Sequence, residues 1–167
     1  MGHEIDVIDP FLMLDHLGPI TYAPGEAVGA PDHPHRGQVT FSYILNGSMQ
    51  HLDSSGASGS MGAGDAQYMV AGRGVVHSEM PGTEIMERGG TIEGFQLWIN
   101  LPAAKKMMEP SYQDVKASQM PVVPLVGKDA AGPKGSAKIV LGSGFGASSP
   151  TEVQGAVTYI DLRLRPG

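Results

Sequence analysis

Glycine and proline interrupt this sequence at short intervals along its whole length. Together the 24 glycines and 13 prolines account for about a fifth of the 167 residues, and they are spread out rather than collected in one tract. Both residues favour turns and end helices and strands, so the apolar runs between them are short. This pattern is typical of many short strands joined by turns. It predicts an all-β sandwich or barrel rather than a helical bundle.

The apolar runs give the positions of the expected strands. They lie at residues 10–22, 39–45, 48–53, 66–70, 75–80, 94–101, 137–141 and 157–164. Asn46-Gly47 is a strong hairpin signal, so we expect the strands on either side of it to pair with each other. The polar, glycine-rich segment 54–64 predicts a loop or the wide end of a hairpin. Residues 103–109 hold good helix formers between two prolines, which predicts one short helix.

The character of the sequence changes near Val115. Prolines and glycines recur between residues 121 and 135, a pattern that predicts a linker. Beyond it, two further apolar runs predict strands. We therefore expect residues 1–114 to form a barrel, and residues 115–167 to form a linker followed by strands.

Charge and composition argue against several classes of function. The net charge of −6 and the pI of about 5.4 argue against direct binding of nucleic acid, which needs a basic surface. No run of 18 apolar residues is present, so no membrane span is expected. The acidic segment Met1 to Asp6 lacks the apolar stretch of a leader peptide, and we expect a cytoplasmic protein. Because the chain has no cysteine, any metal site must use histidine and carboxylate ligands.

Two short pairs of residues carry metal-binding chemistry. His33 and His35 are separated by one residue, and His77 and Glu79 repeat that spacing. Residues i and i+2 of a strand face the same side, so each pair can reach one ion. Three imidazoles and one carboxylate suit a divalent transition metal. The spacing alone leaves open that His33 and His35 are ordinary turn histidines. The other histidines, His16 and His51 among them, lack such a partner, so surface or hydrogen-bonded positions are predicted for them.

Several longer motifs together resemble the pirin family of the cupin superfamily. They occur in the family's order from about residue 9 to residue 113. The motifs are Asp9-Pro10-Phe11-Leu12-Met13-Leu14-Asp15, Pro31-Asp32-His33-Pro34-His35-Arg36-Gly37, Gly64-Asp65-Ala66-Gln67-Tyr68-Met69, Ala71-Gly72-Arg73-Gly74-Val75-Val76-His77-Ser78-Glu79-Met80, Phe95-Gln96-Leu97-Trp98-Ile99-Asn100-Leu101-Pro102 and Glu109-Pro110-Ser111-Tyr112-Gln113. The resemblance implies a cupin, or jelly-roll-like, β-barrel.

The resemblance also implies a metal and an activity. The family's metal ligands fall on His33, His35, His77 and Glu79, and the usual metal is Fe²⁺, with Mn, Ni, Co, Cu and Zn as alternatives. One implied role is a quercetin 2,3-dioxygenase-type activity, in which O₂ cleaves the oxygen heterocycle of a flavonol and carbon monoxide is lost. The alternative is a non-catalytic, metal- or redox-responsive regulator that binds a partner protein.

The enzyme hypothesis gives roles to particular side chains. Glu79 is the carboxylate expected near the metal, so it is the candidate general base for a flavonol hydroxyl. Gln96, Trp98 and Phe41 are candidates for the wall of the substrate pocket. For Trp98 and Phe41 the ordinary alternative is barrel core, whereas Gln96 is polar within an apolar strand.

Two departures from the family pattern qualify these expectations. Gln38-Val39 stands where relatives commonly have Phe-Glu, and the missing acid at Val39 is expected to change metal preference or rate. Family members also carry a second barrel, and residues 115–167 resemble only its beginning. The apolar face left without that barrel predicts a homo-oligomer in which this segment packs on the barrel or on another subunit.

Overall fold

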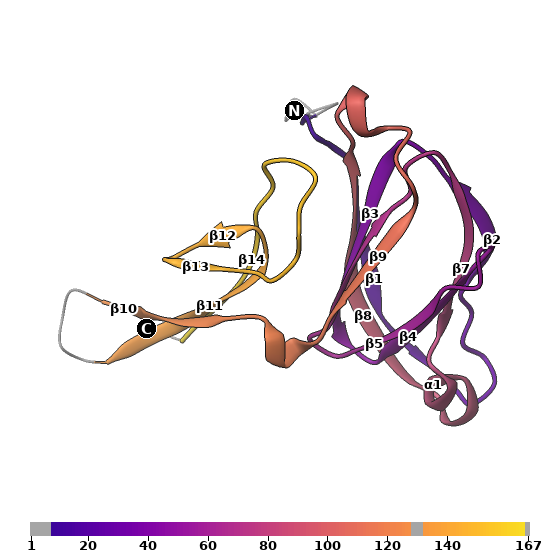
Figure 1. Ribbon diagram of the computed structural model, residues 1–167. Helices are drawn as coiled ribbons and strands as arrows, with labels where there is room; N and C mark the ends of the chain where they lie inside the picture. Colours follow the sequence, from indigo (N-terminus) through magenta and orange to yellow (C-terminus); the bar gives the residue numbers. More distant parts are fainter. Residues whose placement is uncertain (1–7, 128–131, 166–167) are drawn as a thin grey trace, which may run out of the picture. The chain divides into compact units, whose positions relative to one another are not determined.

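The computed structural model describes residues 8–127 and 132–165 (Figure 1). The expectation about Met1 to Asp6 falls outside these described residues. The chain divides into two compact units, residues 1–114 and residues 115–167. Within the described ranges no helix is long and apolar enough to cross a membrane.

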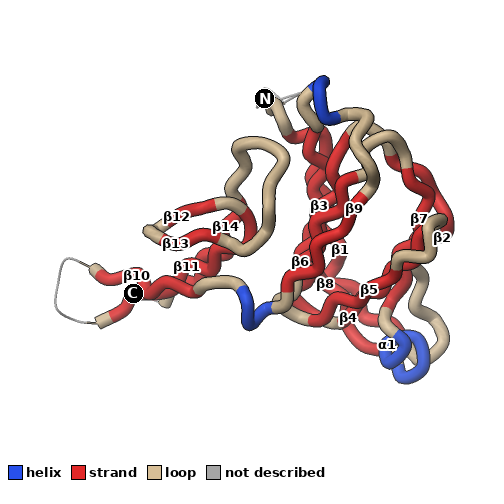
Figure 2. The backbone as a smooth tube through the Cα atoms, in the orientation of Figure 1, coloured by secondary structure: helices blue, strands red, loops and turns tan. Residues whose placement is uncertain are grey.

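The first unit consists of two sheets that face each other, as the strand arrows of Figure 1 and the red segments of Figure 2 show. The five-stranded sheet has the order β1 (Phe11–Tyr22), β8 (Gly90–Asn100), β3 (Gln38–Asn46), β6 (Ala66–Val70) and β9 (Ser111–Val115). The four-stranded sheet has the order β2 (Ala30–His35), β7 (Val75–Pro81), β4 (Ser48–Asp53) and β5 (Ser58–Gly62). This architecture confirms the predicted all-β barrel.

Strand alternation decides which side chains enter the barrel. On β7, His77 and Glu79 are buried, whereas Val76, next to His77, is 41% exposed. On β3, Ser42 pairs with Gln96 of β8, and Phe41 pairs with Leu97. Because neighbouring strand residues point to opposite faces, Ser42 and Gln96 share the inner face, while Phe41 lies on the outer one.

The turn at Asn46-Gly47 does not form the predicted hairpin. β3 pairs with β6 and β8, whereas β4, which follows the turn, pairs with β5 and β7 of the other sheet. The turn is therefore a corner at which the chain crosses between sheets. Gly47 has a φ of 78°, and a Cβ there would lie 2.4 Å from the carbonyl oxygen of Thr91. Both a hairpin and this corner need a glycine with positive φ, so the same dipeptide fits either.

The helical segments also differ from the prediction. Residues 103–109 form only the three-residue 3₁₀ helix Ala103–Lys105, and the α-helix of the described residues is α1 (Thr83–Arg88). The short helix begins directly after Pro102 and ends well before Pro110, so most of the predicted helical segment is not helical. Helix α1 lies between Gly82 and Gly89, and its buried Ile85 packs on Ala27 and Ile92 at one end of the barrel.

The segment 54–64, predicted as a loop or a wide hairpin end, contains strand β5 and forms the end of a hairpin with β4. This strand pairs with β4 in an antiparallel register, with Met49 opposite Met61. Met61 is 2% exposed, so one apolar side chain anchors a strand whose other residues are glycine and serine. A segment with so little apolar alternation gives no strand signal by sequence.

The second unit is built on a three-stranded sheet of β10 (Val122–Val126), β11 (Pro133–Leu141) and β14 (Tyr159–Leu164). A short pair, β12 (Ser143–Gly144) and β13 (Ala147–Ser148), follows β11. The predicted linker at 121–135 is therefore wrong where it overlaps β10 and the start of β11. Pro124 is compatible with β10 because this strand lies at the edge of its sheet.

Candidate metal centre

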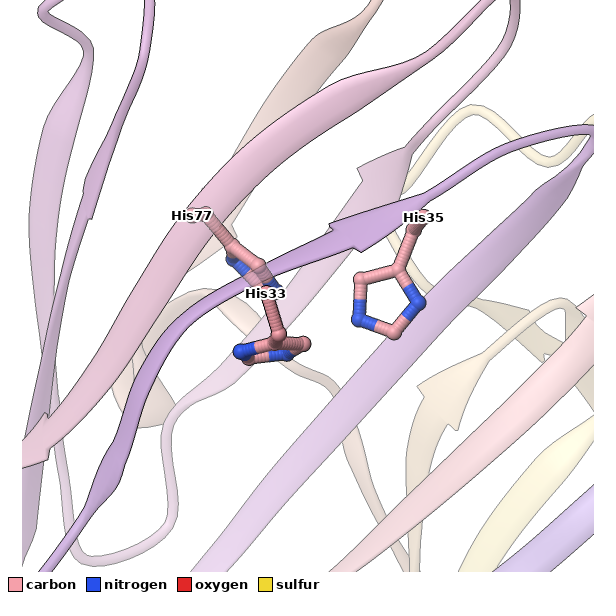
Figure 3. A group of neighbouring side chains, drawn as sticks. All are labelled: His33, His35 and His77. Carbon is pink, nitrogen blue, oxygen red and sulfur yellow. The ribbon is translucent and has the colours of Figure 1, made fainter.

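Three imidazoles meet inside the barrel, as Figure 3 shows. His33 and His35 come from edge strand β2, and His77 comes from the neighbouring strand β7, directly opposite His33. One ring nitrogen from each lies within 4.8 Å of the others. The i, i+2 spacing places both β2 histidines on the inner face, and the β2–β7 register brings the third to them.

Burial leaves these histidines without protein partners for several nitrogens. His35 is 6% exposed and His77 is 1% exposed. His35 Nε2 and both ring nitrogens of His77 have no hydrogen-bond partner among the described residues. A buried polar atom without a partner costs about 1–3 kcal/mol, and native proteins rarely leave several together. A metal ion bound to one nitrogen of each ring would satisfy His35 Nε2 and one nitrogen of His77, so the residues present fit such an ion.

The protonation state of the two buried histidines also suits the binding of a metal ion. Burial, followed by repulsion from His77 and His33, lowers the pKa of His35 to about 4. Burial and the nearby His33 lower the pKa of His77 to about 4. Both rings are therefore neutral at pH 7, and the neutral imidazole is the form that binds metal ions.

A hydrogen bond outside the cluster orients the His33 ring. His33 Nδ1 donates to the carbonyl oxygen of Pro31 at 2.8 Å, because a carbonyl can only accept. This contact fixes the proton on Nδ1 and leaves Nε2 free to act as a ligand.

Glu79 completes the group on the side of His33 and His77. Its Oε2 lies 4.0 Å from His33 Nε2 and 4.0 Å from His77 Nε2. The side chain is buried, at 8% exposure. Gln96 of β8 donates from Nε2 to both carboxylate oxygens, at 3.0 Å each. The two sheets are thus joined at the site by the Gln96–Glu79 contact.

A cavity of about 280 Å³ opens beside this group. His33, Glu79 and Gln96 form its polar end. Its remaining wall is mostly apolar. It comes from β1, from the first residue of β2 and the two residues before it, from β4 and from β8. Those wall residues are Asp15, Leu17, Ile20, Tyr22, Val28, Gly29, Ala30, Met49 and Ile92.

Comparison with known proteins places this chain in a family. The family model described as Pirin matches residues 1–99. The chain belongs to the pirin family. It is 39% identical over 98% of its length to pirin-like protein 2 of Arabidopsis thaliana, and 39% identical over 98% of its length to human pirin. Those matches cover 46% and 51% of the two relatives, so the chain spans about half their length.

A solved structure supports the same relationship in three dimensions. The crystal structure of a quercetin 2,3-dioxygenase from Acinetobacter baumannii superposes with a TM-score of 0.83 and 35% sequence identity. The match covers 92% of this chain and 52% of that one. The pirin resemblance carried by the sequence motifs is therefore confirmed.

The three residues predicted for the pocket of this pirin-family barrel have different positions. Gln96 lines the cavity. Trp98 does not belong to the cavity wall among the described residues; its ring centroid lies 5.2 Å from that of His35, and its Nε1 donates to Gln96 Oε1 at 3.3 Å. Phe41 is 1% exposed on the opposite face of the sheet, so the structure places it away from the cavity.

The pirin-family departure at Gln38-Val39 also has a structural outcome. Gln38 Nε2 lies 3.3 Å from Nδ1 of His35, so position 38 touches a candidate ligand. Val39 follows it on the strand and points to the face opposite the histidines, where it is buried. A side chain at position 39 therefore does not reach the candidate centre directly.

Sequence reasoning misses a second polar group in the barrel interior. His51, predicted at the surface or in a hydrogen bond, is 4% exposed, and neither of its ring nitrogens has a partner among the described residues. Its ring stacks on Tyr112 with centroids 4.5 Å apart. Burial, then nearby Asp53, raises the pKa of Tyr112. The i, i+2 pair His51 and Asp53 is the one sequence signal that could have indicated this group.

Proposed function

We propose that this chain is the metal-bearing part of a dioxygenase of the quercetin 2,3-dioxygenase type, acting on a flavonol-like substrate with O₂. The observation that carries the proposal is that Glu79 and His33, one of the three clustered histidines, line the polar end of a mostly apolar cavity. The superposed Acinetobacter structure is that of a quercetin 2,3-dioxygenase, and this likeness supports the same class of activity here.

One divalent ion, with Fe²⁺ as the first candidate, would be held in the proposed site by His33, His35, His77 and Glu79. Bound there, the ion supplies Lewis-acid chemistry, which lowers the pKa of a nearby hydroxyl, and redox chemistry toward O₂. The protein's contribution is a set of neutral imidazoles and a buried carboxylate placed in advance.

The remaining chemistry belongs to the cavity and to Glu79. Apolar side chains such as Leu17, Met49 and Ile92 receive the rings of the substrate and exclude water from it. The oxygen-bearing edge of the substrate then faces the polar end of the cavity. Glu79 accepts the proton of the flavonol hydroxyl as general base, because its carboxylate is the acidic group at that end.

The test is turnover together with metal content. The chain is loaded with Fe²⁺ without oxygen, mixed with quercetin and exposed to O₂, while the flavonol absorbance is followed. We expect the absorbance to fall for the wild type and to persist for His35→Ala. His16→Ala is the matched control, because His16 is exposed and bonds Glu93 at 3.3 Å, outside the site.

Two results would contradict the proposal. Absence of turnover with Fe, Mn, Ni, Co and Cu would remove the enzyme function and favour a binding role. Retention of a full equivalent of metal by His35→Ala would show that the ligand set is wrong.

A further inference from the structure

The carboxylate of Glu79 is held from one side by a single amide group. Gln96 Nε2 lies 3.0 Å from Oε1 and 3.0 Å from Oε2, so the contact is symmetric. The same nitrogen lies 3.3 Å from Ser42 Oγ on the neighbouring strand β3. Hydrogen bonds to a charged group are stronger than those between neutral groups, so this contact favours one orientation of the buried carboxylate.

A second residue determines which end of the Gln96 amide faces Glu79. Trp98 Nε1 donates to Gln96 Oε1 at 3.3 Å, and an indole N–H can only donate. If the amide were turned round, its nitrogen would face the indole N–H and its oxygen would face the carboxylate, so both contacts would become repulsive. Residues 96 and 98 both point inward because they are two apart on β8.

These contacts leave Gln96 little capacity to bind a substrate. Its two N–H groups face three acceptors, two on Glu79 and one on Ser42, and its oxygen accepts from Trp98. A side chain that only lined the cavity would keep a donor or an acceptor directed into it. The arrangement matches an outer partner of a metal ligand instead, and loss of such partners typically weakens metal binding about 10–100-fold.

We propose that Gln96 is a positioning residue, which holds the Glu79 carboxylate toward His33 and His77, and that Trp98 fixes the orientation of the Gln96 amide. The inference rests on the proposed function in one respect, namely that Glu79 is a ligand of the metal. It assigns Gln96 to the metal centre rather than to recognition of the substrate.

The experiment measures Co²⁺ binding by the chain against a competing chelator, and records the visible absorption spectrum of the Co²⁺ complex. The variants are Gln96→Leu and Trp98→Phe. Gln67→Leu is the matched control, since Gln67 is a buried glutamine of the same barrel that donates to Asp114 Oδ1 at 2.8 Å. Thermal melting of each metal-free variant verifies that it is folded.

We expect Gln96→Leu to bind Co²⁺ about 10–100-fold more weakly and to change the spectrum. Trp98→Phe should shift both in the same direction by less, and it remains informative if Gln96→Leu does not fold. Gln67→Leu should match the wild type. Wild-type affinity and spectrum in both test variants would overturn the inference, as would a rise in KM for quercetin with Co²⁺ binding unchanged.

The two proposals fail in different ways. If the wild type does not turn over quercetin but Gln96→Leu still weakens Co²⁺ binding, the proposed function falls and the positioning role stands. If the wild type turns over quercetin while Co²⁺ binding is the same in Gln96→Leu, only the positioning role falls.

Discussion

Replacement of His77 by leucine separates the cost of the metal-free site from the benefit of the ion. His77 is 1% exposed, and both of its ring nitrogens lack a hydrogen-bond partner among the described residues. Each such buried atom destabilises the metal-free fold by about 1–3 kcal/mol. Leucine fills a similar space without polar atoms. We therefore expect metal-free His77→Leu to be at least as stable as the metal-free wild type, with a gain of about 1–3 kcal/mol for each of the two buried atoms removed.

Bound Co²⁺ should reverse the order, so that the wild type becomes more stable than His77→Leu. A ligand present at about 100 times its Kd stabilises the native state by about 2.7 kcal/mol. A chain of this size gains roughly 2–4 °C in Tm per kcal/mol, so Co²⁺ should raise the wild-type Tm by about 5–10 °C. His77→Leu, which lacks one ligand, should show a much smaller rise at the same Co²⁺ concentration.

The assay is thermal unfolding followed by circular dichroism, with chelator and with Co²⁺. His16→Leu serves as control, because the His16 side chain is 47% exposed and its loss should leave the metal-dependent rise intact. Two outcomes would refute the reasoning. One is a full Co²⁺-dependent rise in Tm for His77→Leu. The other is a metal-free His77→Leu that is less stable than the metal-free wild type, since that loss would mean the imidazole has stabilising partners.

Three further predictions test other parts of the structure. Phe41→Ala should lower the free energy of unfolding in urea by about 3–5 kcal/mol while leaving Co²⁺ affinity unchanged, because Phe41 is buried on the face opposite the site. A folded Phe41→Ala variant with weaker Co²⁺ binding would contradict this position of Phe41. Gly56→Ala should cost about 1–2 kcal/mol for its φ of 88° alone, whereas Gly47→Ala should cost clearly more, because its Cβ would also meet the Thr91 carbonyl; equal losses in urea melts would disprove the close approach. Burial alone would raise the pKa of Asp53, but hydrogen bonds from Ser55 and Ala57 outweigh burial and lower the pKa. The ionised Asp53 therefore stabilises the fold at pH values above its unfolded pKa of about 4. This contribution to stability is lost as the pH falls through the lower pKa of the native state. Asp53→Asn should therefore be less stable than the wild type at pH 7, with a difference that shrinks in acid; a difference that stays constant as the pH is lowered from neutral to strongly acidic would contradict this.

Local spacing predicts that the residues of each i, i+2 pair share one face, but spacing alone leaves open whether they form a metal site. An i, i+2 pair needs only an extended backbone to present both side chains on one side, and β2 and β7 provide it. Which side faces the barrel interior is not local information. Phe41 is a candidate for the pocket wall by sequence, but the register of β3 with β8 places Ser42 beside Gln96 instead.

The corner at Gly47 and the cavity wall also depend on contacts that short-range sequence patterns do not predict. Asn46-Gly47 specifies a positive φ, and the partners of the next strand depend on contacts far away in the sequence. Likewise, Asp15 of β1 meets Gln96 of β8 through pairing between distant parts of the sequence, which no short-range pattern encodes. Turn chemistry and alternation are local, whereas strand partners and the inner face are decided by packing of the whole barrel.

The edge position of β2 gives the candidate centre a mechanical consequence. Among the described strands β2 pairs only with β7, and it contributes two of the three clustered histidines. The residues just before it, Val28 and Gly29, form part of the cavity wall. An ion bound to both strands would clamp the edge strand onto its neighbour, and amide hydrogens of β2 would exchange more slowly with solvent. The rigidity of this part of the cavity wall would then depend on whether the metal ion is bound.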